Sequence, residues 1–373
     1  MTKKITIVSH DMLWPFKGGG AVRIIWIVKT LLEKGYNISL IAPILNENEF
    51  INHFKLKKTL KIYNLGNIHR FQKGKEFLYI KLGFKIFINL LKVDSNIVYA
   101  HNIVSAFPSF IFTRIKKIDL VYDIDDITMG LSKFKLIKKY GPLIEYYVAK
   151  KSEKLITMSK SLANFLINKG VKNKFLIAPH GVDFKIFNNQ HQKRKNWILY
   201  MGGMESHDGV DLIPSAAKIV LKNYPDYKFV FVGDGSQLEK LKHEVKKYGL
   251  EKSFIFYSWV NQDKLAEIVN KAKIGLVTHH YSLACDIALV LKGLEYMACG
   301  LAVIAPNLKG MVEEIGENNQ RGLIFETSNY EDLSEKINLV IKNYKENDVG
   351  EKFVRRNHDW MVISKKISNY ILS

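Results

Sequence analysis

Short β-branched segments alternate with helical segments in two successive series, and this alternation limits the possible folds more than any other feature. Strands joined by crossover helices are parallel, so the pattern predicts parallel sheets covered by helices. The first series of strands is expected at residues 5–9, 37–41, 59–64, 97–100, 119–124, 155–158 and 175–178. The second is expected at residues 197–201, 228–232, 254–257, 274–278 and 302–305. We therefore predict an α/β chain of two domains, which its 373 residues also favour.

A polar stretch without periodicity, residues 186–196, separates the two series. It is predicted to be the interdomain linker. The first domain is expected at residues 1–187 and the second at residues 188–356, with ligands in the cleft between them.

The most informative stretch is DIALVLKGLEYMACGLAVIA, residues 286–305. It predicts a helix from about residue 290 to 299 that ends at Gly300. Lys292 and Glu295 lie three residues apart, so both project from one face near the helix N-terminus, where backbone N–H groups attract anions. A lysine suits a phosphate, and a carboxylate suits a pair of sugar hydroxyls. The alternative is an ordinary Lys–Glu pair on the helix surface.

A glycine run follows the first predicted strand. Gly18, Gly19 and Gly20 lead into a helix expected at residues 21–34. Strand, glycine-rich loop and helix form the first unit of a Rossmann-like domain. The run lacks the GxGxxG spacing, but it would let the backbone approach a sugar or a phosphate.

Positive charge is concentrated in the first half of the chain. Residues 1–185 hold 31 Lys and Arg against 13 Asp and Glu, whereas residues 186–373 hold 25 against 23. The expected partner is anionic: a membrane surface, a phosphorylated acceptor or nucleic acid. Since the chain has no recognisable nucleic-acid motif, we expect no nucleic-acid partner.

Two segments, residues 71–92 and 133–154, place lysines among aromatic residues. Such helices are typical of interfacial membrane binders, although a solvated charged face over buried aromatics is the alternative. The lysines expected to face an anionic membrane are Lys81, Lys85, Lys92, Lys138 and Lys139.

The two cysteines, Cys285 and Cys299, and the absence of a long apolar run bear on location. They favour a reducing compartment without a membrane span. We expect a cytoplasmic protein, peripheral on the inner face of the cytoplasmic membrane.

Six motifs in order resemble those of one family. They are DIDD (residues 123–126), TMSKSL (157–162), IAPHGVD (177–183), LYMGG (199–203), FVGDG (231–235) and KGLEYMACG (292–300). Together they resemble the retaining glycosyltransferases of the GT-B fold, in glycosyltransferase family 4. The resemblance covers nearly the whole chain.

The resemblance implies two Rossmann-like domains that face each other across a cleft, with a C-terminal helix at about residues 357–373 crossing back to the first. The second domain would hold a nucleotide diphosphate sugar, and the first an acceptor. Glu295 would bind the ribose and Lys292 the diphosphate. The other donor-binding positions would be Val290, Leu291, Gly202, Gly203 and the Gly18–Gly20 loop.

The same resemblance implies that Lys292 and Asp125 are catalytic and that Asp126 contacts the acceptor. His101, at the end of a predicted strand, would face the cleft as a further catalytic and acceptor-binding residue, and a structural histidine is the alternative. The acceptor would be a lipid-linked or polysaccharide precursor. Neither a cofactor nor a metal is expected, and the alternative is Mg²⁺ at the paired carboxylates of DIDD. Retention in this family is ascribed to front-face attack, in which the departing phosphate takes the acceptor proton.

Departures from the family pattern leave other readings open. Gly203 and Asp208 stand where an Arg and a Lys are usual, and Ile287 replaces a glutamate. Asp125 replaces a histidine, and His180 replaces an asparagine. The alternatives are a non-catalytic glycosyltransferase-like partner subunit, a nucleotide-sugar epimerase of the same fold and, last, a nucleic-acid binder.

Overall fold

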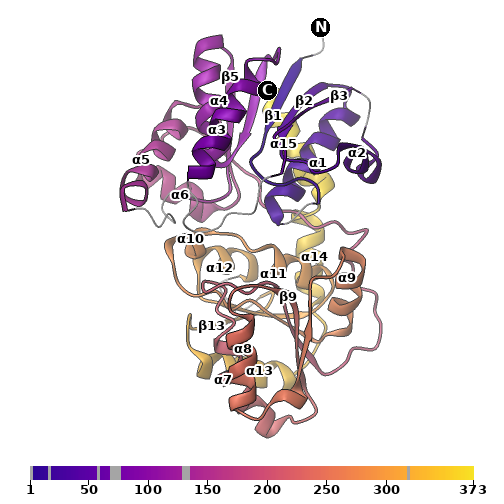
Figure 1. Cartoon of the computed structure of the whole chain (residues 1–373). Coiled ribbons are helices and arrows are strands. Elements are labelled where there is room, and N and C mark those ends of the chain that lie inside the picture. Colours follow the sequence, from indigo (N-terminus) through magenta and orange to yellow (C-terminus); the bar gives the residue numbers. More distant parts are fainter. Residues whose placement is uncertain (1–2, 16–17, 57–58, 68–76, 128–134, 317–319) are drawn as a thin grey trace. The chain divides into compact units, whose positions relative to one another are not determined.

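The structure of this chain is a computed structural model that describes residues 3–15, 18–56, 59–67, 77–127, 135–316 and 320–373. It contains two compact units, drawn in Figure 1. The first comprises Met1–His180 together with Trp360–Ser373, and the second comprises Gly181–Asp359.

The chain passes into the second unit after residue 180, before the predicted residue 187, and returns to the first unit after residue 359, beyond the predicted residue 356. The reason is that the segment entering the second unit pairs with the segment leaving it. The Val182 amide donates to the His358 carbonyl (2.6 Å), and Val182 forms a β-bridge with Asp359.

The segment predicted as the interdomain linker, residues 186–196, lies within the second unit. Arg194 donates to the carbonyls of Ala272 (3.0 Å) and Cys299 (2.7 Å). These bonds tie a segment of polar sequence to the unit's own backbone, which hydrophobic periodicity cannot reveal.

The first unit is built on a seven-stranded parallel sheet in the order β3-β2-β1-β4-β5-β6-β7. Each predicted strand of the first series is present, with small shifts at the ends. The strands are β1 (Lys4–Val8), β2 (Asn37–Ala42), β3 (Leu60–Asn64), β4 (Ile97–His101), β5 (Asp119–Ile124), β6 (Lys154–Thr157) and β7 (Phe175–Ile177). The helices are α1 (Gly19–Glu33), α2 (Glu47–Phe54), α3 (Phe77–Leu90), α4 (Asn102–Lys116), α5 (Lys135–Lys151) and α6 (Lys160–Asn168). Parts of the two basic segments, residues 71–76 and 133–134, lie outside the described residues.

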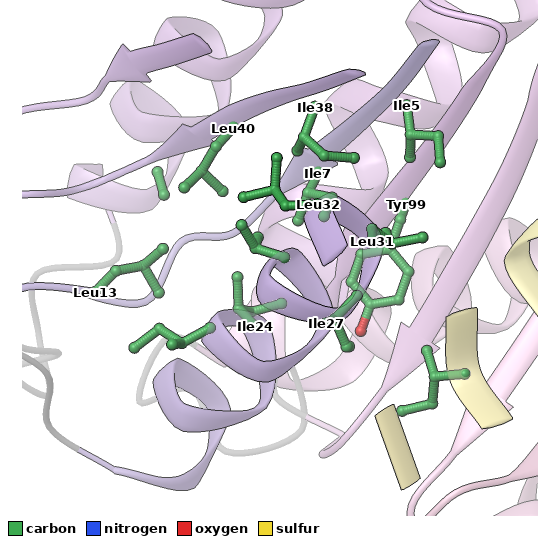
Figure 2. Close-up of a cluster of buried hydrophobic side chains, with 14 of the residues drawn as sticks. Ile5, Ile7, Leu13, Ile24, Ile27, Leu31, Leu32, Ile38, Leu40 and Tyr99 are labelled. Atoms are coloured by element: carbon green, nitrogen blue, oxygen red, sulfur yellow. The ribbon is translucent and has the colours of Figure 1, made fainter. Parts of the chain in front are cut away.

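The C-terminal helix α15 (Trp360–Leu372) packs on α1 in the first unit. Figure 2 shows the core that they share, with Ile24, Ile27 and Leu31 of α1 close to the strands. Ile363 and Ile367 of α15 belong to the same buried cluster. Burial of these apolar surfaces is what holds the end of the chain to its beginning.

The second unit is built on a six-stranded parallel sheet in the order β10-β9-β8-β11-β12-β13. The strands are β8 (Trp197–Gly203), β9 (Lys228–Asp234), β10 (Phe254–Tyr257), β11 (Ile274–Leu276), β12 (Ala302–Pro306) and β13 (Leu323–Phe325). Strand β13 was not predicted, since three residues carry too little pattern to be recognised. The helices are α7 (Leu212–Asn223), α8 (Leu238–Lys247), η2 (Glu251–Ser253), α9 (Gln262–Lys271), α10 (Leu283–Ile287), α11 (Leu291–Ala298), α12 (Lys309–Ile315), α13 (Tyr330–Lys342) and α14 (Asp348–Asn357).

Helix α11 begins and ends where the sequence indicates. Val290 is its N-cap, and Gly300 follows its last turn with φ at 75°. The Gly300 amide returns to the Met297 carbonyl (2.9 Å) and the Leu301 amide to the Tyr296 carbonyl (3.0 Å), the hydrogen bonds of a Schellman-type end.

Among the described residues, no helix combines the length and the apolar character needed to cross a membrane.

Candidate functional site

Each sheet has one pair of neighbouring strands at which the strand order reverses: β1 and β4 in the first sheet, β8 and β11 in the second. In open α/β sheets the carboxyl ends of such strands leave a crevice in which ligands bind. Polar side chains gather at both places.

Lys292, in the first turn of α11, reaches the carboxyl-terminal part of β8. Its Nζ donates to the Tyr200 hydroxyl (2.9 Å) and lies 4.3 Å from the centroid of the Tyr200 ring. The same Nζ is 3.6 Å from Asp208 Oδ1. Burial lowers the pKa of Lys292, and Asp208 opposes that shift. The ammonium group is therefore held in place by a ring and a carboxylate.

Asp208, in the segment that follows β8, is the hub of this cluster. Oδ1 lies 3.3 Å from His279 Nε2, and Oδ2 accepts from the Glu205 amide (2.9 Å). Burial alone would raise the pKa of Asp208, but the hydrogen bond from His279 and the charge of Lys292 hold it below its usual range. The residue that replaces an expected cation is thus the counterion of Lys292.

Glu295 lies one turn after Lys292 and is half-buried. Its carboxyl group has neither a hydrogen bond nor an ion pair within the part of the chain that the structure describes. Burial raises the pKa of Glu295 to about 8, although Lys292 acts to lower it. Because Lys292 pairs with Asp208, the alternative of a Lys–Glu surface pair does not describe this helix, and the Glu295 carboxyl stays available to a ligand.

The predicted glycine turn lies beside Lys292. Gly202 has φ at 117°, and a Cβ there would lie 3.5 Å from Lys292 Cε. Gly203 ends β8, and a Cβ on it would lie 3.3 Å from Asp208 Oδ2. Val290 and Leu291 form the start of α11, where no side chain caps the helix. The start of α11 therefore has no side-chain hydrogen bond from its N-cap residue, and the acidic group near its first turn is the buried Glu314 carboxyl, since a Cβ on Gly293 would lie 3.2 Å from Glu314 Oε2.

The second polar cluster lies at β1, β4 and β5 in the first unit. His101, the last residue of β4, contacts Asp11 Oδ2 through Nδ1 (2.9 Å) and Asp125 Oδ2 through Nε2 (2.9 Å). Burial opposes a charge on this ring, yet the two carboxylates raise the pKa of His101 well above its usual range. We therefore describe His101 as an imidazolium between two carboxylates.

A buried ion pair lies next to that cluster. Arg23 of α1 forms a bidentate pair with Asp123, with Nε–Oδ2 at 2.6 Å and Nη2–Oδ1 at 3.0 Å. Tyr99 also donates to Asp123, and Arg23 donates to the Ala178 carbonyl (2.9 Å). All four residues are buried. The first aspartate of DIDD therefore has a structural partner.

Two departures from the family pattern, Asp125 in place of a histidine and His180 in place of an asparagine, lie next to each other. His180 Nε2 is 3.6 Å from Asp125 Oδ2, so an imidazole is present beside position 125 although it comes from another residue. Asp126 is exposed, unlike Asp125. The amides of both aspartates donate to Asn102 Oδ1, at 2.9 Å and 3.3 Å.

The glycine run brings the start of α1 against this cluster. A Cβ on Gly20 would lie 2.8 Å from both Asp11 Oδ2 and His101 Cε1, and one on Gly19 would lie 3.2 Å from His180 Cε1. Gly18, the N-cap, has φ at 93°. Any larger residue at position 20 would push the acid and the histidine apart.

His10, Asp11 and His101 are close enough for one ligand atom of each to surround a metal ion. Both ring nitrogens of His101 already contact carboxylates, and a metal that binds Nδ1 would have to displace Asp11 from it. The donor set would therefore accept a metal only by breaking an ion pair that the protein already makes.

The five lysines expected at a membrane are exposed on the first unit. Lys81 and Lys85 lie on α3 and Lys92 just after it, whereas Lys138 and Lys139 lie on α5. Lys85 Nζ donates to the Leu65 carbonyl (2.9 Å), so this lysine also has a role within the unit.

Sequence reasoning missed several members of both clusters. Asp11 and His279 each follow a predicted strand, and a polar residue at the carboxyl end of a parallel strand was the available signal. Arg23 interrupts an apolar helix, which indicates a buried charge with a partner elsewhere. Tyr200 carries no such signal, because it reads as a strand core residue.

Comparison with known proteins relates the second unit to one protein family. Residues 182–356 match the family model described as glycosyl transferases group 1. An uncharacterized glycosyltransferase of Methanocaldococcus jannaschii is 26% identical over 351 residues, which cover 90% of this chain and 88% of that protein.

Solved structures share the fold along the whole chain. The sucrose-phosphate synthase of Thermosynechococcus elongatus has a TM-score of 0.80 at 15% identity, over 98% of each chain. Anabaena HepE, solved in complex with UDP, has a TM-score of 0.77 at 15% identity, over 99% of each chain. The chain therefore carries a glycosyl transferases group 1 domain at residues 182–356, within the GT-B fold.

Proposed function

We propose that this protein is a retaining glycosyltransferase that moves a sugar from a nucleotide diphosphate sugar to a lipid-linked or polysaccharide precursor. The observation that carries the proposal is the pair Lys292 and Glu295 on the first turns of α11, beside the carboxyl end of β8. It lies in the domain that matches the glycosyltransferase model, and HepE, with the same fold, binds UDP.

The chemistry asks for charge stabilisation more than for a strong base. A nucleoside diphosphate leaves, so negative charge develops on its β-phosphate. Lys292 and the uncapped start of α11 supply positive charge there, and Glu295 accepts hydrogen bonds from the ribose. The departing phosphate can itself take the acceptor proton, which is consistent with retention.

The first unit is proposed to bind the acceptor. His101, with Asp11 and Asp125 beside it, offers an imidazolium and carboxylates that could orient sugar hydroxyls, and exposed Asp126 adds another acceptor group. We propose that the reaction uses neither a metal nor a cofactor.

The proposed lipid-linked acceptor is supported by an exposed apolar surface on three helices of the first unit. Phe84 on α3, Ile115 on α4 and Tyr147 on α5 are 67%, 61% and 55% exposed. Helix α4 contacts both α3 and α5, and it adds Phe107 and Ile111, which sequence reasoning had not singled out. Exposed apolar residues with flanking lysines suit the surface of an anionic bilayer.

The non-catalytic alternative is favoured by one observation, which is that Asp208 occupies the place of a phosphate-binding cation. Such a subunit would bind the nucleotide without transferring sugar. An epimerase would convert the donor without any acceptor.

The test is a thermal-stability screen of the purified protein with UDP, GDP and their sugars. A ligand at one hundred times its dissociation constant adds about 2.7 kcal/mol, so one nucleotide should raise the melting temperature by several degrees. The matching nucleotide sugar is then incubated with membrane lipid extracts, and the anomeric configuration of the product is read by NMR. Stabilisation by none of the nucleotides would contradict the proposal, and stabilisation with no transfer would favour the non-catalytic subunit.

A further inference from the structure

The diphosphate pocket of the proposed function presents a charge problem. Asp208 Oδ1 is 3.6 Å from Lys292 Nζ, so the cation expected to hold the diphosphate already has a counterion. Asp208 is buried and its carboxylate is stabilised, so it does not lose its charge at neutral pH. A diphosphate that approaches Lys292 would meet this carboxylate.

His279 is placed to resolve the problem. It follows β11, its side chain is 10% exposed, and its Nε2 lies 3.3 Å from the same Oδ1 that faces Lys292. Its Nδ1 is buried without a hydrogen-bond partner among the described residues. With the proton of a neutral ring on Nε2, Nδ1 is the position at which a second proton can be added.

The groups that face His279 determine when that proton is added. They are Asp208, Lys292 and His207, and His207 Nε2 is 3.9 Å from Asp208 Oδ2. Burial and the positive Lys292 lower the pKa of His279, whereas Asp208 raises it. An anion bound at Lys292 would cancel the lysine's effect and favour the imidazolium.

We infer that Asp208 and His279 form a proton-linked counterion pair, in which His279 takes up a proton as a nucleoside diphosphate draws Lys292 away from Asp208. The inference rests on the proposed function, because it needs the diphosphate at Lys292. His279 acts through Asp208 and is therefore a positioning residue. In this way the proton on His279 offsets the negative charge of Asp208 when the diphosphate binds.

The experiment is calorimetry of the full chain with UDP and GDP at pH 7.5, in buffers of different ionisation enthalpy. Glu295, whose pKa is raised to about 8, would lose its own proton when it binds the ribose as a carboxylate, so the series is run on Glu295→Gln as well as on the wild type. In Glu295→Gln the nucleotide should bring at least about half a proton of uptake, and its affinity should rise as pH falls from 8 to 6.5, by up to roughly tenfold per pH unit. The nucleotide's own phosphate would release protons on binding a cation, so it cannot mimic uptake.

Two variants and one control, each combined with Glu295→Gln so that Glu295 releases no proton, separate the outcomes. His279→Gln should abolish the uptake, whereas His207→Gln, whose ring is 55% exposed, should keep it. Asp208→Asn should also abolish it and bind the nucleotide roughly three- to tenfold more tightly, because a negative charge is removed from the pocket. A merely structural aspartate would instead weaken binding when replaced.

Uptake that persists in His279→Gln would place the proton on another group and overturn the inference, as would weaker binding by a folded Asp208→Asn protein. Nucleotide binding without any proton uptake would refute the counterion pair and leave the proposed function standing. Absence of binding by every nucleotide would refute the proposed function itself.

Discussion

Lys292 is the residue on which the proposed chemistry depends most. Its ammonium group lies against Tyr200 and Asp208 and is the cation at the start of α11. We expect Lys292→Ala to lower turnover by well over tenfold, on the order of 2 kcal/mol of transition-state stabilisation. Steady-state kinetics with the matching nucleotide sugar measure the effect. Lys264→Ala, at an exposed Lys–Glu pair on α9, is the control and should change nothing. Near-wild-type turnover in Lys292→Ala would contradict the assignment.

Glu295 should decide nucleotide affinity through the ribose. Glu295→Gln keeps the shape of the side chain but removes the ionised acceptor, so at pH 9, above the Glu295 pKa of about 8, affinity should fall by roughly tenfold. Calorimetry with the nucleoside diphosphate that stabilises the protein is the measurement. Glu267→Gln, on the surface of α9, is the matched control. Equal affinities of the wild type and Glu295→Gln would remove Glu295 from the site.

Glu295 should also lower the free energy of unfolding as pH rises. Burial raises the pKa of Glu295 from 4.5 to about 8, so between these values the folded state binds a proton that the unfolded state has lost. The free energy of unfolding therefore falls as pH increases across that range, by on the order of 3 kcal/mol in total. Glu295→Gln removes this loss.

We expect the melting temperature of Glu295→Gln, relative to the wild type, to be several degrees higher at pH 8 than at pH 5. Thermal unfolding of both proteins at the two pH values provides the comparison. A constant difference between them would mean that the Glu295 carboxyl is not held in its neutral form. A Glu295 carboxyl that lowers the stability of the folded protein is more readily explained by a role in binding than by a role in packing.

At the scale of elements, the C-terminal helix α15 is expected to be essential for the first unit. Ile367 is fully buried in the cluster that α15 shares with α1, and Thr30 of α1 donates to Ser364 of α15 (2.8 Å). Ile367→Ala should therefore lower the free energy of unfolding of this unit by about 2–4 kcal/mol. Urea unfolding followed by tryptophan fluorescence reports it, and exposed Lys365→Ala is the control. Equal stability of both variants would show that α15 is not part of the cooperative unit.

At the scale of the whole molecule, the excess of positive charge in residues 1–185 should hold the protein to anionic membranes. Lys81, Lys85, Lys92, Lys138 and Lys139 could each contribute up to about 1 kcal/mol near such a surface. We expect flotation with anionic liposomes, weakened by salt and by changing these five lysines to glutamate.

The control for that experiment is a set of five exposed lysines of the second unit changed to glutamate: Lys218, Lys222, Lys240, Lys242 and Lys246. This variant carries the same change in net charge and should still float. Equal flotation of the wild type on neutral and anionic vesicles, or flotation on neither, would favour a soluble acceptor.

The sequence alone determined the features that depend on local spacing. Two series of strands and helices follow from hydrophobic periodicity, and they form the two parallel sheets as predicted. The placement of Lys292 and Glu295 near the start of α11 follows from helical geometry, and the end of that helix follows from Gly300.

Only the tertiary structure decided which side chains meet. Asp208 is 84 positions from Lys292 in the chain, and Arg23 is 100 from Asp123, so no local pattern joins them. The unit boundaries likewise depend on the pairing of Val182 with His358 and Asp359. Such contacts arise when parallel strands bring their carboxyl ends to one edge, because the order of the strands then sets which distant residues become neighbours.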